Sequence, residues 1–241
     1  MKIKVLDKTV DFFEHDVGNK SQLAVSSSSG TDSTIVLYLT ALCFPNRKII
    51  PYHIEESQYP DQKPNLLKII DYFNSILPTK NIDILISDWV DYSAPDSKWR
   101  LKAIETPGEL PPRPKGNIGQ AKILACHHYI RQRFINGDFD YIVYGSTSNP
   151  PIEVLKELAC PYEERRSRRN APVIDTNFYS PFYHIDKSYI AEMFKEYNIM
   201  DVFPLTISCI EMRPEFKRPC KECFFCNEKK WAFGMYDGGM K

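Results

Sequence analysis

Residues 22–43, with the sequence QLAVSSSSGTDSTIVLYLTALC, contain the pattern that decides the fold. Gln22–Val25 is short and mostly apolar, the serine-rich segment that follows contains Gly30, and Thr34–Cys43 is apolar without Gly or Pro. This order predicts a β-strand, a tight loop and a buried α-helix. Such a loop points backbone N–H groups and the positive end of the helix dipole at one place, where a phosphate or pyrophosphate can bind.

The side chains of this serine loop suit a phosphate site. Hydroxyls of Ser28, Ser33 and Thr34 can donate to phosphate oxygens, and Gly30 lets the backbone come close because it has no Cβ. Asp32 can hold a loop amide or help to place a magnesium ion. The alternative is an ordinary serine-rich turn in which Asp32 or Ser33 caps the helix. The loop is neither a P-loop, since no Gly-Lys-Ser/Thr follows, nor the three-glycine dinucleotide motif.

The alternation of strand and helix continues along the chain. Lys48–Tyr52 and Ile82–Ile86 read as strands, and residues 66–77 carry apolar side chains at helical spacing. Another helix from Ile118 and a strand at Asp140–Tyr144 follow. This pattern predicts a three-layer α/β fold, in which helices cover both faces of a mostly parallel sheet. A length of 241 residues fits one such domain with a small appendage.

Composition and charge exclude several classes of protein. Lys and Arg number 31, as do Asp and Glu, so the chain lacks the overall basic charge that gathers nucleic acid, and a small-molecule substrate is favoured. No apolar stretch of membrane-spanning length exists, so no membrane partner is expected. Met1–Val5 is too short and too charged for a signal peptide, and we expect a cytoplasmic protein.

Four of the seven cysteines form a C-x10-C-x2-C-x2-C motif near the C-terminus. The motif consists of Cys209, Cys220, Cys223 and Cys226. This spacing directs four thiolates at one ion and indicates a structural Zn²⁺ site without an open position for water. An iron–sulfur cluster is the alternative. We expect residues 1–205 to form the α/β domain and residues 206–241 to form a metal-binding segment packed on it.

The two motifs together carry a resemblance to a known family. The serine loop resembles the Ser-Gly-Gly-x-Asp-Ser loop of the PP-loop ATP pyrophosphatases, and with the cysteine motif the chain resembles the 7-cyano-7-deazaguanine synthase (QueC) family of these enzymes. Four further elements fit that family: Pro114–Asn117, Ile142–Gly145, Ser180–Ile190 and Thr206–Cys209. The chain departs from the family where Ser29 replaces a Gly, where Lys115 and Gly116 interrupt an Arg-Asn pair, and at residues 53–56.

The resemblance implies an adenine nucleotide α-hydrolase-like fold and a specific reaction. The carboxylate of 7-carboxy-7-deazaguanine would attack the α-phosphate of ATP, giving an acyl-adenylate and pyrophosphate. Ammonia would then displace AMP to form an amide, and a second activation would dehydrate the amide to the nitrile. A related carboxylate as substrate, or the amide as final product, stays open.

The resemblance also implies roles for individual residues. The nucleotide would contact Ser28, Ser29, Gly30, Thr31, Asp32, Ser33, Asn117 and Gly145. The catalytic residues would be Ser28, Asp32, Ser33 and Lys187, although a solvated position in the first turn of a helix, with Asp186 as its N-cap, is an equal alternative for Lys187. Arg113 and Lys115 either contact phosphate or lie in a solvated loop. Magnesium would bridge the phosphates, and the family resemblance suggests a homodimer.

Two other classes of function remain open from the sequence. One is a PP-loop enzyme that modifies tRNA, against which the zero net charge argues. The arginines of the run Arg165–Arg169 could contact RNA phosphates or cover a bound nucleotide. The alternative is that they pair with Glu163 and Glu164 on an exposed segment. The other is a binding module without activity, for which the Ser29 departure is the best support.

Overall fold

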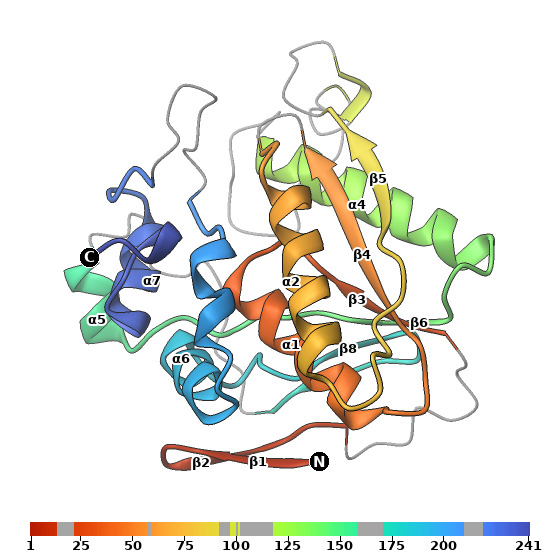
Figure 1. Ribbon diagram of the computed structural model, residues 1–241. Coiled ribbons are helices and arrows are strands. Elements are labelled where there is room, and N and C mark those ends of the chain that lie inside the picture. The colour runs from red at the N-terminus through yellow and green to blue at the C-terminus, as the bar shows by residue number, and fades with distance from the viewer. Residues whose placement is uncertain are drawn as a thin grey trace.

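Strands and helices alternate along the chain in the order that the sequence predicts (Figure 1). The computed structural model describes residues 1–13, 22–56, 59–91, 97–99, 101, 118–158, 171–209 and 219–241. The strands are β1 (Lys2–Val5), β2 (Lys8–Asp11), β3 (Leu23–Ser26), β4 (Ile49–Glu56), β5 (Ile86–Val90), β6 (Tyr141–Val143), β7 (Val173–Ile174) and β8 (Phe178–Ser180). The helices are α1 (Thr31–Cys43), α2 (Gln62–Ile76), α4 (Ile118–Ile135), α5 (Ile152–Glu157), α6 (Lys187–Glu196) and α7 (Phe224–Phe233), with 3₁₀ helices η1 (Met200–Leu205) and η2 (Asp237–Gly239).

In the described part of the chain, six strands form one sheet in the order β5-β4-β3-β6-β8-β7. The first five are parallel, and β7 pairs antiparallel with β8 at one edge. The predicted mixed α/β fold with a mostly parallel sheet is therefore confirmed. The strands β1 and β2 form a separate antiparallel hairpin.

The alternation of side chains along β3 shows why helices cover both faces of the sheet. Leu23 and Val25 point to the face where the large hydrophobic core lies, formed with residues of α1, α2 and α6. Ala24 points to the opposite face, where Tyr52, Ile142 and residues of α4 surround it. Figure 1 shows α1 and α2 in front of the sheet and α4 behind it. No helix in the described ranges is long and apolar enough to span a membrane.

The order of the strands reverses between β3 and β6. From β3 the chain adds β4 and β5 on one side, and it then returns to place β6 and β8 on the other. In open parallel sheets, ligands bind at the carboxyl ends of the strands at such a reversal, because the loops there diverge. The serine loop follows β3 and Gly145 follows β6, so both lie at this position.

The strand that the sequence predicts at Ile82–Ile86 begins later in the structure. Ile82 makes only an isolated bridge to Ile49, and the continuous ladder with β4 begins at Ile86. At that bridge the N–H of Ile49 donates to the carbonyl of Asn81 and the N–H of Asp83 donates to the carbonyl of Ile49, both at 2.9 Å. The side-chain amide of Asn74 binds the N–H and the carbonyl of Ile82 on the side away from β4, at 3.2 and 2.9 Å. The apolar residues of this run therefore do not all belong to the sheet, and Ile84 is exposed.

The C-terminal helix joins the main core. Phe233 at the end of α7 packs edge to face against Phe194 of α6, with ring centres 5.3 Å apart. The same ring lies 4.8 Å from the ring of Phe203 in η1. These contacts bring the segment that carries the cysteines next to α6, whose first residue is Lys187.

Candidate functional site

The serine loop wraps around the hydroxyl group of Ser33. This hydroxyl accepts from the N–H of Ser28 at 3.2 Å and donates to the carbonyl of Gly30 at 3.0 Å. Gly30 is the N-cap of α1, and no side chain caps the helix. The first N–H groups of a helix have no partner within it, so the amides of this turn and the positive end of the dipole remain available to an anion. The alternative in which Asp32 or Ser33 is the N-cap is wrong, because the helix begins at Thr31.

Ser29 occupies a conformation that favours glycine. Its φ is +55°, in the left-handed region, which costs a residue with a Cβ about 1–2 kcal/mol. Its side chain is fully buried, and the hydroxyl has no hydrogen-bond partner among the described residues. The carbonyl of Ser29 accepts from the N–H of Ile207 at 2.9 Å. Any contact of Ser29 with a nucleotide would therefore involve its backbone.

The hydroxyl groups of the loop differ in their access to a ligand. Ser28 is exposed, and its Oγ accepts from the N–H of Gly30 at 3.4 Å. Thr34 is buried in the core side of α1, and its hydroxyl has no partner among the described residues. The suggestion that Thr34 donates to a phosphate is therefore wrong, whereas Ser28 remains a candidate donor.

Gly145 is required by the close approach of β6 to α1. A Cβ at this position would lie 2.5 Å from the carbonyl oxygen of Asp32 and 2.7 Å from the nitrogen of Ser33. Both distances are shorter than non-bonded atoms tolerate. The glycine thus allows the strand end to support the first turn of α1.

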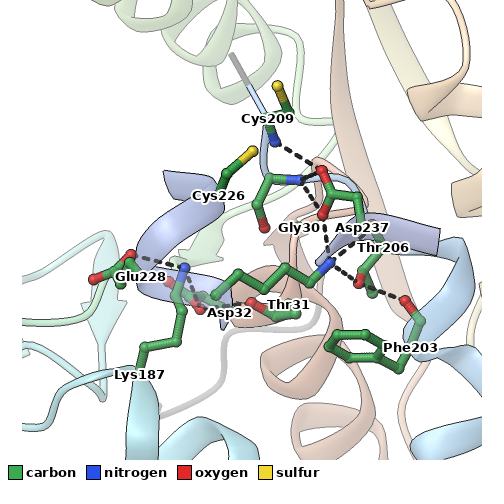
Figure 2. Close-up of polar contacts among 12 residues, drawn as sticks. Gly30, Thr31, Asp32, Lys187, Phe203, Thr206, Cys209, Cys226, Glu228 and Asp237 are labelled. Carbon is green, nitrogen blue, oxygen red and sulfur yellow. Dashed lines mark hydrogen bonds and ion pairs between the residues drawn. The ribbon is translucent and has the colours of Figure 1, made fainter. Parts of the chain in front are cut away.

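Asp32 lies in the first turn of α1 and accepts three polar contacts. Thr31 donates from its Oγ1 at 3.1 Å, and Thr147, in the loop after β6, donates at 3.1 Å. Lys187 Nζ lies 3.4 Å from Asp32 Oδ1 (Figure 2). The carboxylate is therefore held by side chains on two other segments and does not bind a loop amide in the contacts described.

Lys187 is a buried lysine at the start of α6. Asp186 caps this helix, as predicted, by accepting from the N–H of Ser188 at 3.0 Å. Lys187 is only 4% exposed, and its Nζ lies 3.1 Å from Glu228 Oε2 in addition to its contact with Asp32. The alternative of a solvated lysine is therefore wrong. Its Nζ therefore lies in contact with two carboxylates next to the serine loop.

The four cysteines of the motif meet at one place. Their sulfur atoms all lie within 4.8 Å of one another, and those of Cys220 and Cys226 are 3.9 Å apart. Backbone N–H groups of Glu222 and Cys223 donate to Cys220 Sγ at 3.4 and 3.2 Å. Hydrogen bonds with Cys209 and Cys223, together with burial, raise the pKa of Cys226. Four thiols crowded in this way ionise together only when a cation offsets their charge.

The sulfur spacing fits a single ion. A tetrahedral Zn²⁺ with bonds of about 2.3 Å places its sulfur ligands about 3.8 Å apart, close to the Cys220–Cys226 separation. A cluster of several irons fills a larger volume between its ligands and holds their sulfurs farther apart. The arrangement therefore fits one metal ion better than an iron–sulfur cluster.

A second buried network connects the cysteine cluster to the core. Asp237 accepts from the N–H groups of Ser208 and Cys209 and from Lys229 Nζ, at 2.6 to 3.0 Å. Lys229 is fully buried and also donates to the hydroxyl and carbonyl oxygens of Thr206, at 2.6 and 3.0 Å. Burial lowers the pKa of Lys229 to about 8, although Asp237 opposes this effect.

Several of these residues give no clear signal in the sequence. Glu228 and Lys229 belong to a charged run that resembles the solvated face of a helix. Thr147 lies 115 positions from Asp32, and Asp237 lies 28 positions from Cys209. His53 is also buried, and its Nδ1 donates to the carbonyl of Ser27 at 2.7 Å, which fixes the start of the serine loop. Asn117, Arg113, Lys115 and Arg165–Arg169 lie outside the described residues.

Comparisons with known proteins show a likeness of fold at low sequence identity. No protein-family model matches the sequence, and no curated protein matches it by sequence. The structure is similar to the U34-tRNA thiolase NcsA from Methanococcus maripaludis, solved with its [4Fe-4S] cluster, with a TM-score of 0.44 and 13% identity. The matched region covers 90% of this chain and 64% of the thiolase chain.

A second solved structure is similar over much of the chain. It is NMN synthetase from Francisella tularensis, with a TM-score of 0.45 and 9% identity, over 88% of this chain and 77% of the synthetase. Neither likeness is close enough to transfer an activity. The function proposed below therefore rests on the residues of this chain.

Proposed function

We propose that the chain is an ATP-dependent enzyme of the PP-loop type that cleaves ATP between its α- and β-phosphates. The observation that carries this proposal is the uncapped first turn of α1 at the strand reversal, with buried Lys187 beside it. The amides of that turn would hold the pyrophosphate portion of ATP, and Lys187 would offset charge as it develops on the phosphates. Magnesium would supply further positive charge between the phosphate oxygens, next to Asp32.

The reaction we propose converts a carboxylate to a nitrile. One carboxylate oxygen of 7-carboxy-7-deazaguanine attacks the α-phosphorus, the bond to the bridging oxygen breaks, and pyrophosphate leaves. Ammonia attacks the resulting acyl-adenylate, AMP leaves with its electron pair, and a proton is released to give the amide. The amide oxygen then attacks the α-phosphorus of a second ATP and pyrophosphate leaves. The resulting O-adenylated amide loses AMP and two protons to give the nitrile. The family resemblance of the serine loop and the cysteine motif supports this choice of substrate.

The residues around the loop take different parts in this proposal. The exposed hydroxyl of Ser28 and the amides of residues 31–33 would bind phosphate oxygens, while Ser33 keeps the loop folded. Gly145 would let the loop after β6 lie against the nucleotide-binding turn. Asn117 belongs to this proposal through the resemblance alone.

We propose that the four cysteines hold one Zn²⁺. Four sulfur ligands leave no open position, so the ion would anchor the C-terminal segment and take no part in bond making. Metal analysis of the purified protein tests this assignment. One zinc per chain is expected, and iron with labile sulfide would contradict it.

Mass spectrometry of a reaction with ATP, ammonium and the carboxylate tests the proposed function. The nitrile is expected, and the amide alone would limit the reaction to its first half. Pyrophosphate release without any change of the deazapurine would keep the ATP chemistry and contradict the substrate. A gel shift with tRNA that persists at raised salt would favour the tRNA-modifying class. Absence of any nucleotide turnover would favour a binding module.

A further inference from the structure

Helix α7 lies between the cysteine cluster and the serine loop. Cys223 is its N-cap, and Cys226 and Glu228 follow within the first two turns. On an α-helix, the side chains of residues i and i+2 point in directions that differ by about 200°. Cys226 therefore faces the other cysteines. Glu228 faces Lys187, and a dashed line joins the two in Figure 2.

The first link to the loop runs through Glu228. Its side chain is fully buried, and a buried carboxylate is stable only when it is paired and hydrogen-bonded. Lys187 Nζ lies 3.1 Å from Glu228 and 3.4 Å from Asp32, so one ammonium group joins α7 to the first turn of α1. A change in the position of α7 would therefore move the charged group of Lys187 relative to the phosphate-binding turn.

The second link runs through residues 206–209. Cys209 belongs to the cluster, and its N–H donates to Asp237, which Lys229 of α7 also contacts. Two residues before Cys209, the N–H of Ile207 donates to the carbonyl of Ser29. The segment that supplies one cysteine thus also supports the loop residue with the left-handed backbone.

We propose that Glu228 is a positioning residue through which the metal centre and the nucleotide site strengthen each other. The inference rests on the proposed ATP site. When a triphosphate occupies the turn, its charge competes with Asp32 for Lys187, and Glu228 keeps the ammonium in place. The same pair then restrains α7 and with it Cys226. Because such coupling is reciprocal, a nucleotide should raise zinc affinity by the factor by which zinc raises nucleotide affinity.

Two equilibrium measurements on the zinc-loaded protein test this coupling. Calorimetry gives the Kd of Mg²⁺ with α,β-methylene-ATP, and competition with a chelator that does not bind Mg²⁺ gives zinc affinity with and without the analogue. We expect the analogue to raise zinc affinity about tenfold in the unmodified protein. Glu228→Gln should bind one zinc, bind the analogue about tenfold more weakly and lose the coupling. The matched control is Glu192→Gln, which removes an exposed carboxylate of α6 that pairs with Lys195. This variant should keep both the affinity for the analogue and the coupling to zinc.

Each outcome decides between the proposals. If Glu228→Gln keeps both the affinity and the coupling, the inference is wrong. If that variant fails to fold or to take up zinc, Lys187→Gln decides, because it removes the other half of the pair from α6 and should also abolish the coupling. An unmodified protein that binds the analogue with unchanged zinc affinity would overturn the coupling and leave the ATP site standing. An unmodified protein that does not bind the analogue would overturn the proposed function and this inference together.

Discussion

The ammonium group of Lys187 lies in a buried position between the carboxylates of Asp32 and Glu228. Burial of a charge is unfavourable, so this arrangement has to be maintained by its partners. Preorganised positive charge in a dry site stabilises charge that develops during a reaction more strongly than it would in water. Lys187 is therefore the single side chain on which we expect phosphate chemistry to depend most.

Replacement of Lys187 tests this role. Lys187→Gln should reduce the rate of pyrophosphate release by about 10²–10³, the usual effect of removing one group that stabilises transition-state charge. The measurement is steady-state pyrophosphate release at saturating ATP. Lys195→Gln, an exposed lysine in the last turn of the same helix, is the control and should leave the rate unchanged. A rate within twofold of the unmodified protein for Lys187→Gln would contradict its catalytic role.

The left-handed backbone of Ser29 predicts that its replacement by glycine stabilises the protein. Ser29→Gly removes the cost of a left-handed φ and an unpartnered buried hydroxyl, but it also increases the entropy of the unfolded chain. We expect a net stabilisation of about 1 kcal/mol, which raises Tm by roughly 2–4 °C for a chain of this size. Ser26→Gly, in the extended strand β3, should instead lower Tm. A lower Tm for Ser29→Gly, measured by calorimetry, would show that the residue is not strained.

At the scale of elements, the contact between the end of β6 and the start of α1 fixes the candidate phosphate site. Gly145→Ala would place a methyl group within 2.7 Å of three backbone atoms of Asp32 and Ser33. We expect the first turn of α1 to shift, with a loss of about 1–3 kcal/mol of stability and at least tenfold weaker binding of an ATP analogue. Denaturant unfolding and calorimetry measure the two effects.

A glycine elsewhere provides the control for that prediction. Gly137 has a φ of +74° but open space where a Cβ would lie, so Gly137→Ala should lose stability and keep nucleotide affinity. Unchanged affinity in Gly145→Ala would mean that this turn of α1 does not bind the nucleotide.

Metal removal tests how far α7 depends on its cysteine cluster. Without an ion, the four cysteines take up protons and lose the bonds to the metal that hold them together, and the first turn of α7 should unfold. A loss of about 3 kcal/mol would lower Tm by roughly 6–12 °C. Circular dichroism and thermal unfolding with and without a zinc chelator measure this change. Cys43→Ser, outside the cluster, should still bind one zinc, whereas an unchanged Tm after chelation would contradict a structural role for the ion.

At the scale of the whole molecule, local patterns in the sequence predict the order of the elements. The stretch around Gly30 predicts β3, its loop and α1, because apolar runs and a loop of small residues are local properties. The start of β5 could not be predicted in this way, because Asn81 and Asp83 hydrogen-bond to Ile49 at an isolated bridge and the ladder resumes only at Ile86, a break that no local pattern marks. The cysteine spacing likewise predicts the cluster but not what lies beside it.

The contacts around the site depend on residues far apart in the chain. Thr147 reaches Asp32 across 115 positions, and Lys229 reaches Thr206 across 23. Glu228 and Lys229 are charged residues in a helix, for which solvent exposure is the usual expectation. Only the packing of α7 on α6 turns them into buried partners of Lys187, Thr206 and Asp237, and no local pattern reports that packing.

The identity of the products formed from ATP tests the central claim most directly. The protein is incubated with MgATP, ammonium and 7-carboxy-7-deazaguanine, and the nucleotides and phosphates are separated and quantified over time. Cleavage at the α-phosphorus predicts AMP and pyrophosphate in equal amounts, formed only when the carboxylate is present. Formation of ADP and orthophosphate, or no consumption of ATP by a protein that is folded and zinc-loaded, would contradict the assignment of the serine loop as an ATP pyrophosphatase site.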